Sequence, residues 1–319
     1  MMKAIKTILF MFFIVNSVFS QQKIDSNSWL LAVSNDEKYV AYFKSNNDEP
    51  DEYIEGNIYI YNIENNSISK VDNETYIYDF LKVIPDDLGG FYMSTGDEVM
   101  KIDFFNGQKR KVFNTNDNES INGISLSEDN DCLVIVLEKD LNNDVYQKII
   151  LLDLKGKDNL LTNIPLHFKK TDRFQEDICA FINSTNIKYY IKNFKHELIE
   201  YDLQNDKYIV IDENVLKLLV TSENYIYYQK ENGIIEYDIV TNEKTVIIES
   251  EKISLSFFKV NGKKIFLCLN DNIFIYDKEK ESFKNLKQLG KRNFKFFGKK
   301  IALLETDNNS LSIFFNSNK

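Results

Sequence analysis

The sequence predicts an all-β fold, built from a four-stranded unit that recurs along the chain. Three observations support this: aromatic residues make up 13% of the 319 residues, Gly (11) and Pro (3) are scarce, and one short pattern returns at a regular spacing. Aromatic and β-branched residues favour strands, and no stretch keeps the 3.6-residue period of an amphipathic helix. Apolar residues make up 43% of the chain, which is enough for a packed core.

The recurring pattern is an apolar run that ends in Asp or Asn, then a polar turn, then a second apolar run. It is clearest in IIEYDIVTNEKTVII (234–248), of which LIEYDLQNDKYIVI (198–211) is a near copy. We call the Asp or Asn the marker of each unit, and the markers are Asn62, Asp103, Asp153, Asp202, Asp238, Asp277 and Asn316. They recur at intervals of 36 to 50 residues, a period typical of repeat architectures. We expect each marker side chain to accept hydrogen bonds from the turn that follows it.

Each unit divides into four short strands joined by turns. The strands of the fifth unit are predicted at VLKLLVTS (215–222), YIYYQK (225–230), IIEYDI (234–239) and TVIIE (245–249). Asn232-Gly233 is expected at the centre of a type I′ hairpin turn, where both residues take positive φ. The strands lack strict alternation of apolar and polar residues, which fits sheets that are buried on both faces.

Seven such units predict a single seven-bladed β-propeller with four-stranded antiparallel blades over residues 21–319, with six or eight blades as alternatives. The stretch LAVSNDEKYVAYFKS (31–45), followed by NIYIYNI, resembles the repeats of TolB-like and WD40-like propellers. In those repeats a Ser-x-Asp-Gly-Lys turn joins the first two strands, and here Glu37 stands where Gly is usual. The resemblance implies an architecture and no particular activity, because one fold hosts many functions.

The last unit is one strand short. Only three residues follow Asn316, so its fourth strand must come from elsewhere. A propeller closes when one blade takes strands from both ends of the chain. We therefore expect QQKID (21–25) to pair with the strand around Leu311 to Phe315.

Residues 1–20 are predicted to be a secretory signal peptide. MMKAIK carries two lysines, TILFMFFIV is a nine-residue apolar stretch, and cleavage is expected near Ser20 and Gln21. Nine apolar residues are too few for a membrane span, which needs about 20, and no later segment is apolar enough. The protein is therefore expected to be exported, to the periplasm or the extracellular space.

Composition and motifs argue against several kinds of partner and site. The net charge is −10, and loss of the two lysines in residues 1–20 would take it to −12, which argues against nucleic acid as a partner. Cys132, Cys179 and Cys268 lie within or beside apolar runs and are predicted to be buried free thiols.

His167, in a connector, and His196, in a turn, are predicted to lie at the surface. The sequence has no nucleophile elbow, no phosphate loop and no metal-ligand spacing, so no cofactor or metal is expected.

Topology predicts where a partner would bind. In a four-stranded meander, the loop between the second and third strands and the connection to the next blade lie at the same end of the sheet. Long loops are where function usually resides. The acids expected at this end, as partner-binding residues, are Asp48, Glu49, Asp51, Glu52, Glu55, Asp117, Glu119, Asp140 and Asp144.

The predicted function is that of an exported, non-enzymatic, monomeric propeller that binds a protein partner, a basic one, through this acidic face. One alternative is an immunity-type protein that neutralises a basic toxic enzyme in the same compartment. The other is a polysaccharide-active hydrolase or lyase with a pair of carboxylates in the central channel, which the sequence does not locate.

Overall fold

The computed structural model describes the chain in segments. The described residues are 19–46, 54–72, 74, 76–77, 81–116, 118–127, 130–141, 144–155, 159–169, 179–183, 188–192, 196–202, 207–222, 224–249, 255–269, 272–285, 294–297, 301–305 and 310–316. They form strands and no helix, which confirms the all-β prediction, and within them no helix is long and apolar enough to cross a membrane. Contacts gather into two compact units, residues 1–75 with 255–319, and residues 76–254. Each unit is described by itself.

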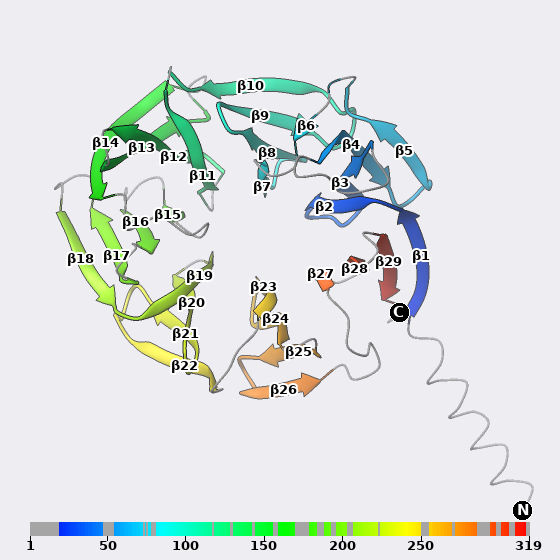
Figure 1. The fold of residues 1–319 in the computed structure, drawn as a ribbon. Helices are drawn as coiled ribbons and strands as arrows, with labels where there is room; N and C mark the ends of the chain where they lie inside the picture. Colours follow the sequence, from blue (N-terminus) through cyan, green and yellow to red (C-terminus); the bar gives the residue numbers. More distant parts are fainter. Residues whose placement is uncertain are drawn as a thin grey trace, which may run out of the picture. The chain divides into compact units, whose positions relative to one another are not determined.

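The first unit contains three antiparallel sheets (Figure 1). In hydrogen-bonded order, the first is β27 (Phe294–Phe297), β28 (Ile301–Glu305), β29 (Leu311–Asn316) and β1 (Phe19–Asp25). The second is β2 (Ser28–Val33), β3 (Tyr39–Ser45), β4 (Glu55–Asn62) and β5 (Ser67–Lys70). The third is β23 (Leu255–Asn261), β24 (Lys264–Leu269), β25 (Asn272–Asp277) and β26 (Ser282–Asn285).

The second unit contains four sheets and begins with the short strand β6 (Tyr76–Ile77). The first sheet is β7 (Leu81–Pro85), β8 (Gly90–Thr95), β9 (Glu98–Asp103) and β10 (Lys109–Asn114). The second is β11 (Ser120–Leu126), β12 (Cys132–Leu141), β13 (Asp144–Asp153) and β14 (Asn159–Lys169). The third is β15 (Cys179–Asn183), β16 (Lys188–Lys192), β17 (Leu198–Asp202) and β18 (Lys207–Asp212). The fourth is β19 (Val215–Ser222), β20 (Tyr225–Lys230), β21 (Gly233–Asp238) and β22 (Lys244–Glu249).

Successive sheets pack face to face within each unit. In the first unit, Tyr42 of β3 shares a buried cluster with Leu311 and Ile313 of β29. In the second, Leu198 of β17 is buried against Tyr228 of β20. Four-stranded antiparallel meanders that pack in this way define a β-propeller, so the propeller architecture and the four-stranded blades predicted from the repeat are confirmed.

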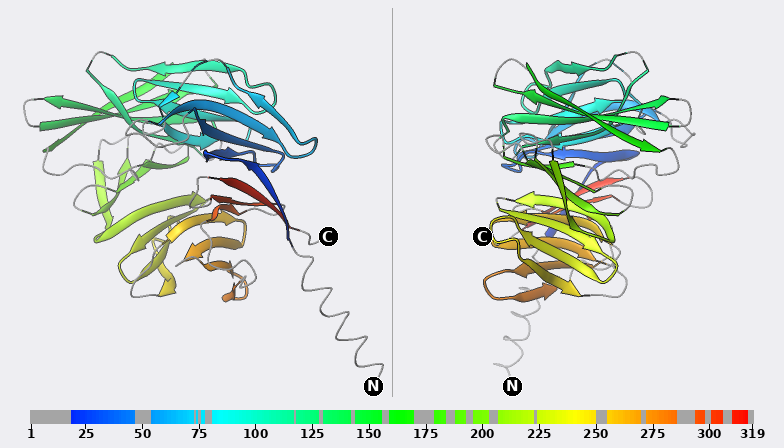
Figure 2. Two further views of the ribbon diagram at one scale, coloured as in Figure 1. Left: turned by 45° about the vertical axis from the view of Figure 1, so that its right-hand side comes forward. Right: turned by 90° about the vertical axis from the view of Figure 1, so that its left-hand side faces the viewer.

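The sheet β11–β14 has the longest strands of the second unit, at 10 residues for β12, 10 for β13 and 11 for β14. These strands extend past their neighbours in the left-hand view of Figure 2. The registers of β12 on β13 and of β13 on β14 run to Leu141 and Asp144. The prediction that His167 lies in a connector is wrong, because this residue belongs to β14.

Strand pairing moves one predicted turn by a residue. Lys230 pairs with Gly233, so the turn between β20 and β21 consists of Glu231 and Asn232. Gly233 is the first residue of β21, and a Cβ atom there would lie 2.2 Å from the carbonyl oxygen of Ile248. The prediction of a type I′ turn centred on Asn232-Gly233 is therefore wrong. Glycine is needed for a close backbone approach rather than for positive φ.

Five of the seven markers bind the turn backbone as predicted, and the turns after Asp202 and Asn316 lie outside the described residues. Asp238 Oδ1 accepts hydrogen bonds from the N–H groups of Val240 (2.8 Å) and Thr241 (3.0 Å). Marker side chains make equivalent bonds in four other sheets, at Asn62, Asp103, Asp153 and Asp277. Each bond satisfies a turn N–H group that has no strand partner, which is the usual role of Asp and Asn in turns.

The residue after the marker makes a second repeated bond. The N–H of Ile63 donates to the carbonyl of Lys38, and that of Phe104 donates to the carbonyl of Gly89. The same bond occurs from Leu154 to Asp131, from Ile239 to Asn224 and from Lys278 to Lys263. It fastens the turn between the third and fourth strands to the turn between the first two strands. We call this end of each sheet the turn end, and the opposite end the connector end.

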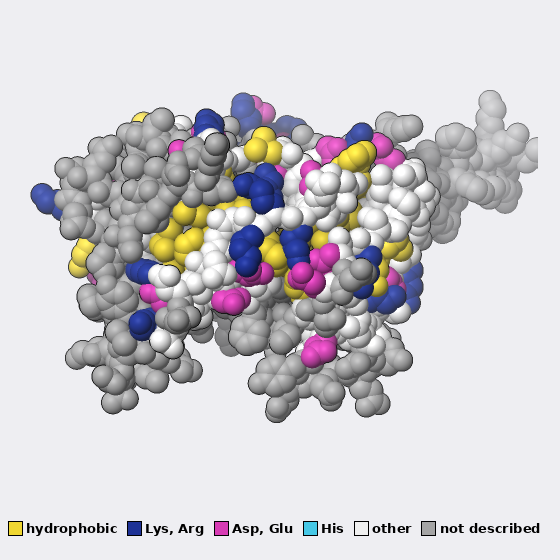
Figure 3. Space-filling model, turned by 90° about the horizontal axis from the view of Figure 1, so that it is seen from above, with side chains coloured by type: hydrophobic (Ala, Val, Ile, Leu, Met, Phe, Trp, Pro, Cys, Tyr) yellow, Lys and Arg dark blue, Asp and Glu magenta, His cyan; other side chains and the backbone are white. Residues whose placement is uncertain are grey.

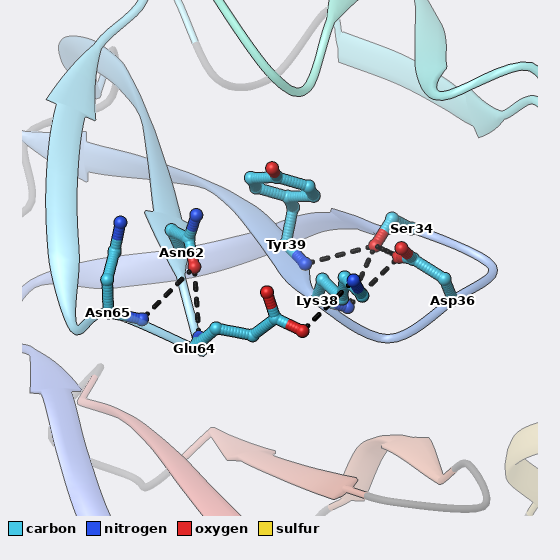
Figure 4. A network of polar contacts seen from close by, with 7 residues as sticks. All are labelled: Ser34, Asp36, Lys38, Tyr39, Asn62, Glu64 and Asn65. Atoms are coloured by element: carbon cyan, nitrogen blue, oxygen red, sulfur yellow. Dashed lines mark hydrogen bonds and ion pairs between the residues drawn. The ribbon is translucent and has the colours of Figure 1, made fainter.

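The turn between β2 and β3 requires particular residues, because their side chains bind its backbone (Figure 4). Ser34 Oγ accepts hydrogen bonds from the N–H groups of Lys38 (3.1 Å) and Tyr39 (3.0 Å), and donates one to Asp36 Oδ1 (2.7 Å). Glu37 has a φ of 58°, the left-handed conformation that glycine adopts at least cost. This explains why the corresponding turns of the propellers that the sequence resembles have Gly at this position.

The missing strand of the last sheet comes from the N-terminal part of the chain, as predicted. Gln21 pairs with Phe314 and Gln22 pairs with Ile313 in an antiparallel register. The strand starts at Phe19, two residues before the predicted cleavage site. Residues 1–18, and with them most of the predicted signal peptide, lie outside the described residues.

Two of the three cysteines can be compared with the prediction. Cys132 and Cys268 are buried and free, as expected. Cys179 is the first residue of β15, and its side chain lies outside the described part of the chain. The tyrosine-rich run of β20 is core rather than a binding platform, because Tyr227 and Tyr228 are fully buried.

Charged side chains of both signs mix on the surface drawn in Figure 3, between bands of hydrophobic side chains. Lys111 of β10 pairs with Glu98 of β9. Lys101 pairs with the buried Asp86 at 2.6 Å. Local pairing of this kind means that a net charge of −10 does not by itself create a uniformly negative surface.

We predict that the β1 strand stabilises the first unit through Ile24. This side chain packs on the cluster of Tyr42, Leu311 and Ile313. Ile24→Ala should lower the free energy of unfolding by about 1 to 2 kcal/mol, since it removes partly buried methyl groups. Lys23→Ala, at an exposed position of the same strand, is the control and should change it by less than about 0.5 kcal/mol. Urea denaturation gives both values, and equal values would contradict a packing role for β1.

We also predict a specific cost for the first turn of the β2–β5 sheet. Ser34→Ala removes the side-chain acceptor of the Tyr39 N–H group and one of the two side-chain acceptors of the Lys38 N–H group, the other being Asp36 Oδ1. It should cost about 1 to 2 kcal/mol. Ser67→Ala is the matched control, because the Ser67 hydroxyl bonds only an exposed Asn65 side chain. Thermal unfolding followed by circular dichroism compares the two, and a Ser34→Ala protein as stable as the control would refute this role.

Candidate functional site

The predicted partner-binding acids divide into three groups. Glu55 is exposed at the start of β4, where its carbonyl accepts the N–H of Asn46. Its neighbours in the predicted loop, and one connector acid, lie outside the described residues: Asp48, Glu49, Asp51, Glu52 and Asp117. The remaining three acids, Glu119, Asp140 and Asp144, belong to the second unit.

Glu119 is occupied by an internal partner. Its Oε1 lies 2.6 Å from Nζ of Lys148, and the two side chains are only 12% and 14% exposed. An ion pair held this far from water is costly to break, because each charge would be left uncompensated. Glu119 is therefore neutralised within the second unit, and its predicted role in partner binding stays a prediction.

Asp140 and Asp144 are strand residues rather than loop residues. Asp140 pairs with Val145, and Leu141 pairs with Asp144, so both acids lie at the tip of one hairpin. The structure brings these two predicted residues together at the connector end of the β11–β14 sheet. The polar residues at 139–146 predict a loop, but strand pairing reaches Leu141 on one side and Asp144 on the other.

His196 gives no sign of a metal centre, and the side chain of His167 lies outside the described part of the chain. His196 is exposed, with a φ of 59°. Among the described residues, no group of three or more His, Cys, Asp or Glu side chains is placed to hold a metal ion.

A polar cluster lies at the connector end of the second unit. Asp212, at the end of β18, accepts hydrogen bonds from the Tyr228 hydroxyl (2.6 Å) and from Lys230 Nζ (2.8 Å) of β20. Lys244 Nζ lies 3.5 Å from the same carboxylate and donates to the carbonyl of Ile211 at 2.7 Å. The cluster fastens the outer strand of one sheet to the second strand of the next.

The cluster shifts the pKa values of its members. Burial alone would raise the pKa of Asp212, but the hydrogen bonds from Lys230 and Tyr228 outweigh it, and the pKa is lowered from 3.8. Burial, together with the hydrogen bond to the Asp212 carboxylate and its charge, raises the pKa of Tyr228 well above its ordinary value. At neutral pH the carboxylate is therefore ionised and the phenol is neutral.

The first unit contains the same arrangement. Asp25, at the end of β1, accepts hydrogen bonds from Lys44 Nζ (2.9 Å) and from the Tyr42 hydroxyl (3.3 Å) of β3. In both copies the Asp is followed two residues later by an Asn with positive φ, Asn27 or Asn214. The repetition identifies the cluster as a junction between sheets, a structural role, rather than as catalytic machinery.

A cavity of about 610 Å³ opens beside the Asp212 cluster. Its lining residues come from the connector end of the β19–β22 sheet and from the connection that precedes it: Asn214, Lys230, Glu231, Asn232, Gly233, Ile235, Val246 and Glu249. A volume of this size is typical of ligand sites. The cavity lies at the end of the sheet where the sequence predicts binding, but on a different blade from the predicted acids.

Sequence reasoning missed the two acids of this cavity. The sequence predicts Glu231 at a turn and Glu249 at the end of a strand, and gives neither a role in binding. The pairing of Gly233 with both Lys230 and Glu249 brings the two acids to one end of the sheet. The marker Asp238 sets this register, so counting back from the marker to the turn is the signal that could have located them.

Comparisons with known proteins support the fold alone. No family model and no curated protein matches the chain. Among solved structures, it is similar to an oligogalacturonate lyase in complex with manganese, with a TM-score of 0.63, 10% identity, and coverage of 94% of this chain and 91% of the lyase. It is also similar to an acylaminoacyl peptidase of Pyrococcus horikoshii, with a TM-score of 0.61 and 16% identity, over 88% of this chain and 49% of the peptidase. The chain thus spans about half the length of that peptidase.

A third similar structure is the computationally designed protein Ika8, with a TM-score of 0.56, 10% identity, and coverage of 92% of this chain and 99% of the design. Identities this low carry no activity from one protein to another. The class that the fold and the comparisons define is therefore a β-propeller repeat protein. Its function has to be argued from its own site.

We predict that the Asp212 cluster makes stability depend on pH in the acid range. Because the folded-state pKa of Asp212 is lowered, its contribution is complete above about pH 4 and is lost as the pH falls through the folded-state value. Asp212→Asn should cost about 1 to 2 kcal/mol at pH 7. The stability difference between the wild type and this variant should shrink from pH 6 to pH 3. Urea unfolding across this range tests the claim, which a constant difference would contradict.

Proposed function

We propose that the protein is an exported, non-enzymatic propeller that binds a basic protein partner through the connector ends of its blades. The carrying observation is the contrast between the two ends of the sheets. At the turn end, the marker and the residue after it make the same hydrogen bonds in five sheets. At the connector end, strand lengths differ between blades, and the cavity of the second unit opens there.

We further propose that the seven sheets found among the described residues close into one seven-bladed ring. The strand β1, paired to β29, supports closure of the last blade by both ends of the chain. In such a ring all connector ends share one face. The acids of the loop between β3 and β4 would then lie on the same side as Asp140 and Asp144.

Charge supports a basic partner. The chain carries 49 acidic and 39 basic residues, and the loop from residue 46 to residue 55 adds Asp48, Glu49, Asp51, Glu52 and Glu55 without any basic residue. Charges concentrated on exposed loops steer an oppositely charged partner and raise its rate of association. An immunity-type role, in which the partner is a basic toxic enzyme, is one form of the same proposal. Export rests on the sequence of residues 1–20.

The test begins with a pull-down by the mature protein from its own envelope fraction, followed by association kinetics with the purified partner. Asp48→Asn, Glu49→Gln and Asp51→Asn together should slow association about tenfold at low salt. The difference should shrink as salt rises, since exposed charges are screened over about 8 Å at physiological ionic strength.

The control removes three acids from the turn end, in Glu64→Gln, Glu243→Gln and Glu279→Gln, and so matches the change in net charge. This variant should associate at close to the wild-type rate. If both triple variants slow association equally, net charge rather than the connector face attracts the partner, and the proposed face is wrong.

A further inference from the structure

We infer that the cavity beside Asp212 binds a cationic side chain, the guanidinium of Arg or the ammonium of Lys, presented by a partner. This deepens the proposed function and rests on it for the source of the side chain. The binding chemistry itself can be tested without any partner.

The cavity exists because one face of the β19–β22 sheet lacks a side chain at its connector end. Lys230, Gly233 and Glu249 are cross-strand neighbours, and Ile235 pairs with Val246 in the next layer of the same face. Glycine at position 233 leaves the space between the aliphatic layer and the end of the sheet empty. The carbonyl of Ile248, 2.2 Å from where a Cβ would be, keeps this position a glycine.

The inner layer of the cavity lining is aliphatic, and the outer layer, at the end of the sheet, is polar. Ile235 is 8% exposed and Val246 is 51% exposed, so they offer an aliphatic floor of which Val246 is still open to solvent. Glu231 and Glu249 are exposed at the rim, from the β20–β21 turn and the end of β22. Asn214 and Asn232 add carboxamide oxygens that accept hydrogen bonds.

The electrostatics favour a cation. The cavity lining contains two carboxylates and one ammonium. That ammonium, Lys230, is already bound to Asp212 at 2.8 Å, so its charge is offset by a carboxylate outside the lining. Lys244, outside the lining, shares the same Asp212 carboxylate at 3.5 Å, so these two lysines and three acids together leave one negative charge. Neither rim glutamate has an ion-pair partner within the described part of the chain.

A long cationic side chain matches both layers at once. The alkyl stems of Lys and Arg bury readily on apolar surface while the charged head stays at a polar rim. On this surface the stem would lie on Val246 and Ile235, and the head would lie between Glu231 and Glu249. An anion would meet the same two carboxylates, and a purely apolar group would leave them without a counter-charge.

The experiment uses small probes and the mature full-length chain. N-acetyl-arginine amide is titrated and followed by NMR or calorimetry, and N-acetyl-citrulline amide, its uncharged isostere, is titrated in parallel. The arginine probe should bind about two- to thirtyfold more tightly than the citrulline probe, which is the range that two exposed ion pairs provide. The double variant Glu231→Gln, Glu249→Gln should lose about this factor for the arginine probe alone.

Two further variants separate charge from shape. Glu243→Gln removes one acid from the turn end of the same sheet and should leave the affinity for the arginine probe unchanged. Val246→Phe fills the cavity at a half-exposed position of an edge strand and should abolish binding of the arginine probe without unfolding the protein. Equal affinity for the two probes, no binding of the arginine probe to the wild type, or wild-type affinity in the double variant would each overturn the inference.

The two proposals fail separately. If the protein binds the arginine probe but no partner depends on the loop acids, this inference stands and the proposed function is wrong. If association with a partner depends on the loop acids but the cavity does not bind the arginine probe, the proposed function stands and this inference is wrong.

Discussion

The rest of the structure depends on one recurring constraint: the marker side chain at the end of each third strand. Asp238 Oδ1 takes two N–H groups of the following turn, and the next N–H, from Ile239, donates to the carbonyl of Asn224 in the first turn. Two turns of the sheet are thus tied together, and with them the register of all four strands. A one-residue slip would turn every side chain to the opposite face, so packing between neighbouring sheets requires this register. The repetition of these bonds in five sheets explains why repeat units with little sequence similarity to one another still fold into similar sheets.

The constraint acts at one end of the sheet and leaves the other end free to vary. At the connector end, β12 and β13 lengthen to 10 residues each, and the β19–β22 sheet opens a cavity. Stability is maintained there by different means, the Asp25 and Asp212 clusters, each of which joins an outer strand to the second strand of the next sheet. A rigid turn end and a variable connector end are what a scaffold needs if function is to sit on loops.

Most of the fold could be predicted because its signals are local. Apolar runs, turn residues and a marker every few tens of residues specify the strands, and even β1 follows from counting the strands of the last unit. The candidate site could not be predicted because it depends on register across strands. Moving one turn from Asn232-Gly233 to Glu231-Asn232 decides which residues meet Glu249. The ion pair of Glu119 could not be predicted for a related reason: its partner Lys148 lies 29 residues away, on a strand whose facing side chains the sequence does not identify.

The role of each acidic side chain depends on where it lies in the sheet. Acidic side chains do three different jobs in this protein. The Asp markers bind turn N–H groups through Oδ1, and Asp212 and Glu119 are neutralised by internal lysines. Acids that serve neither purpose keep their charge available for another molecule. Glu231 and Glu249 belong to this remainder and border a cavity with an aliphatic floor. A net charge of −10 therefore overstates the charge offered to a partner. The proposed selectivity for cations rests on the few acids at the connector end that have no internal lysine.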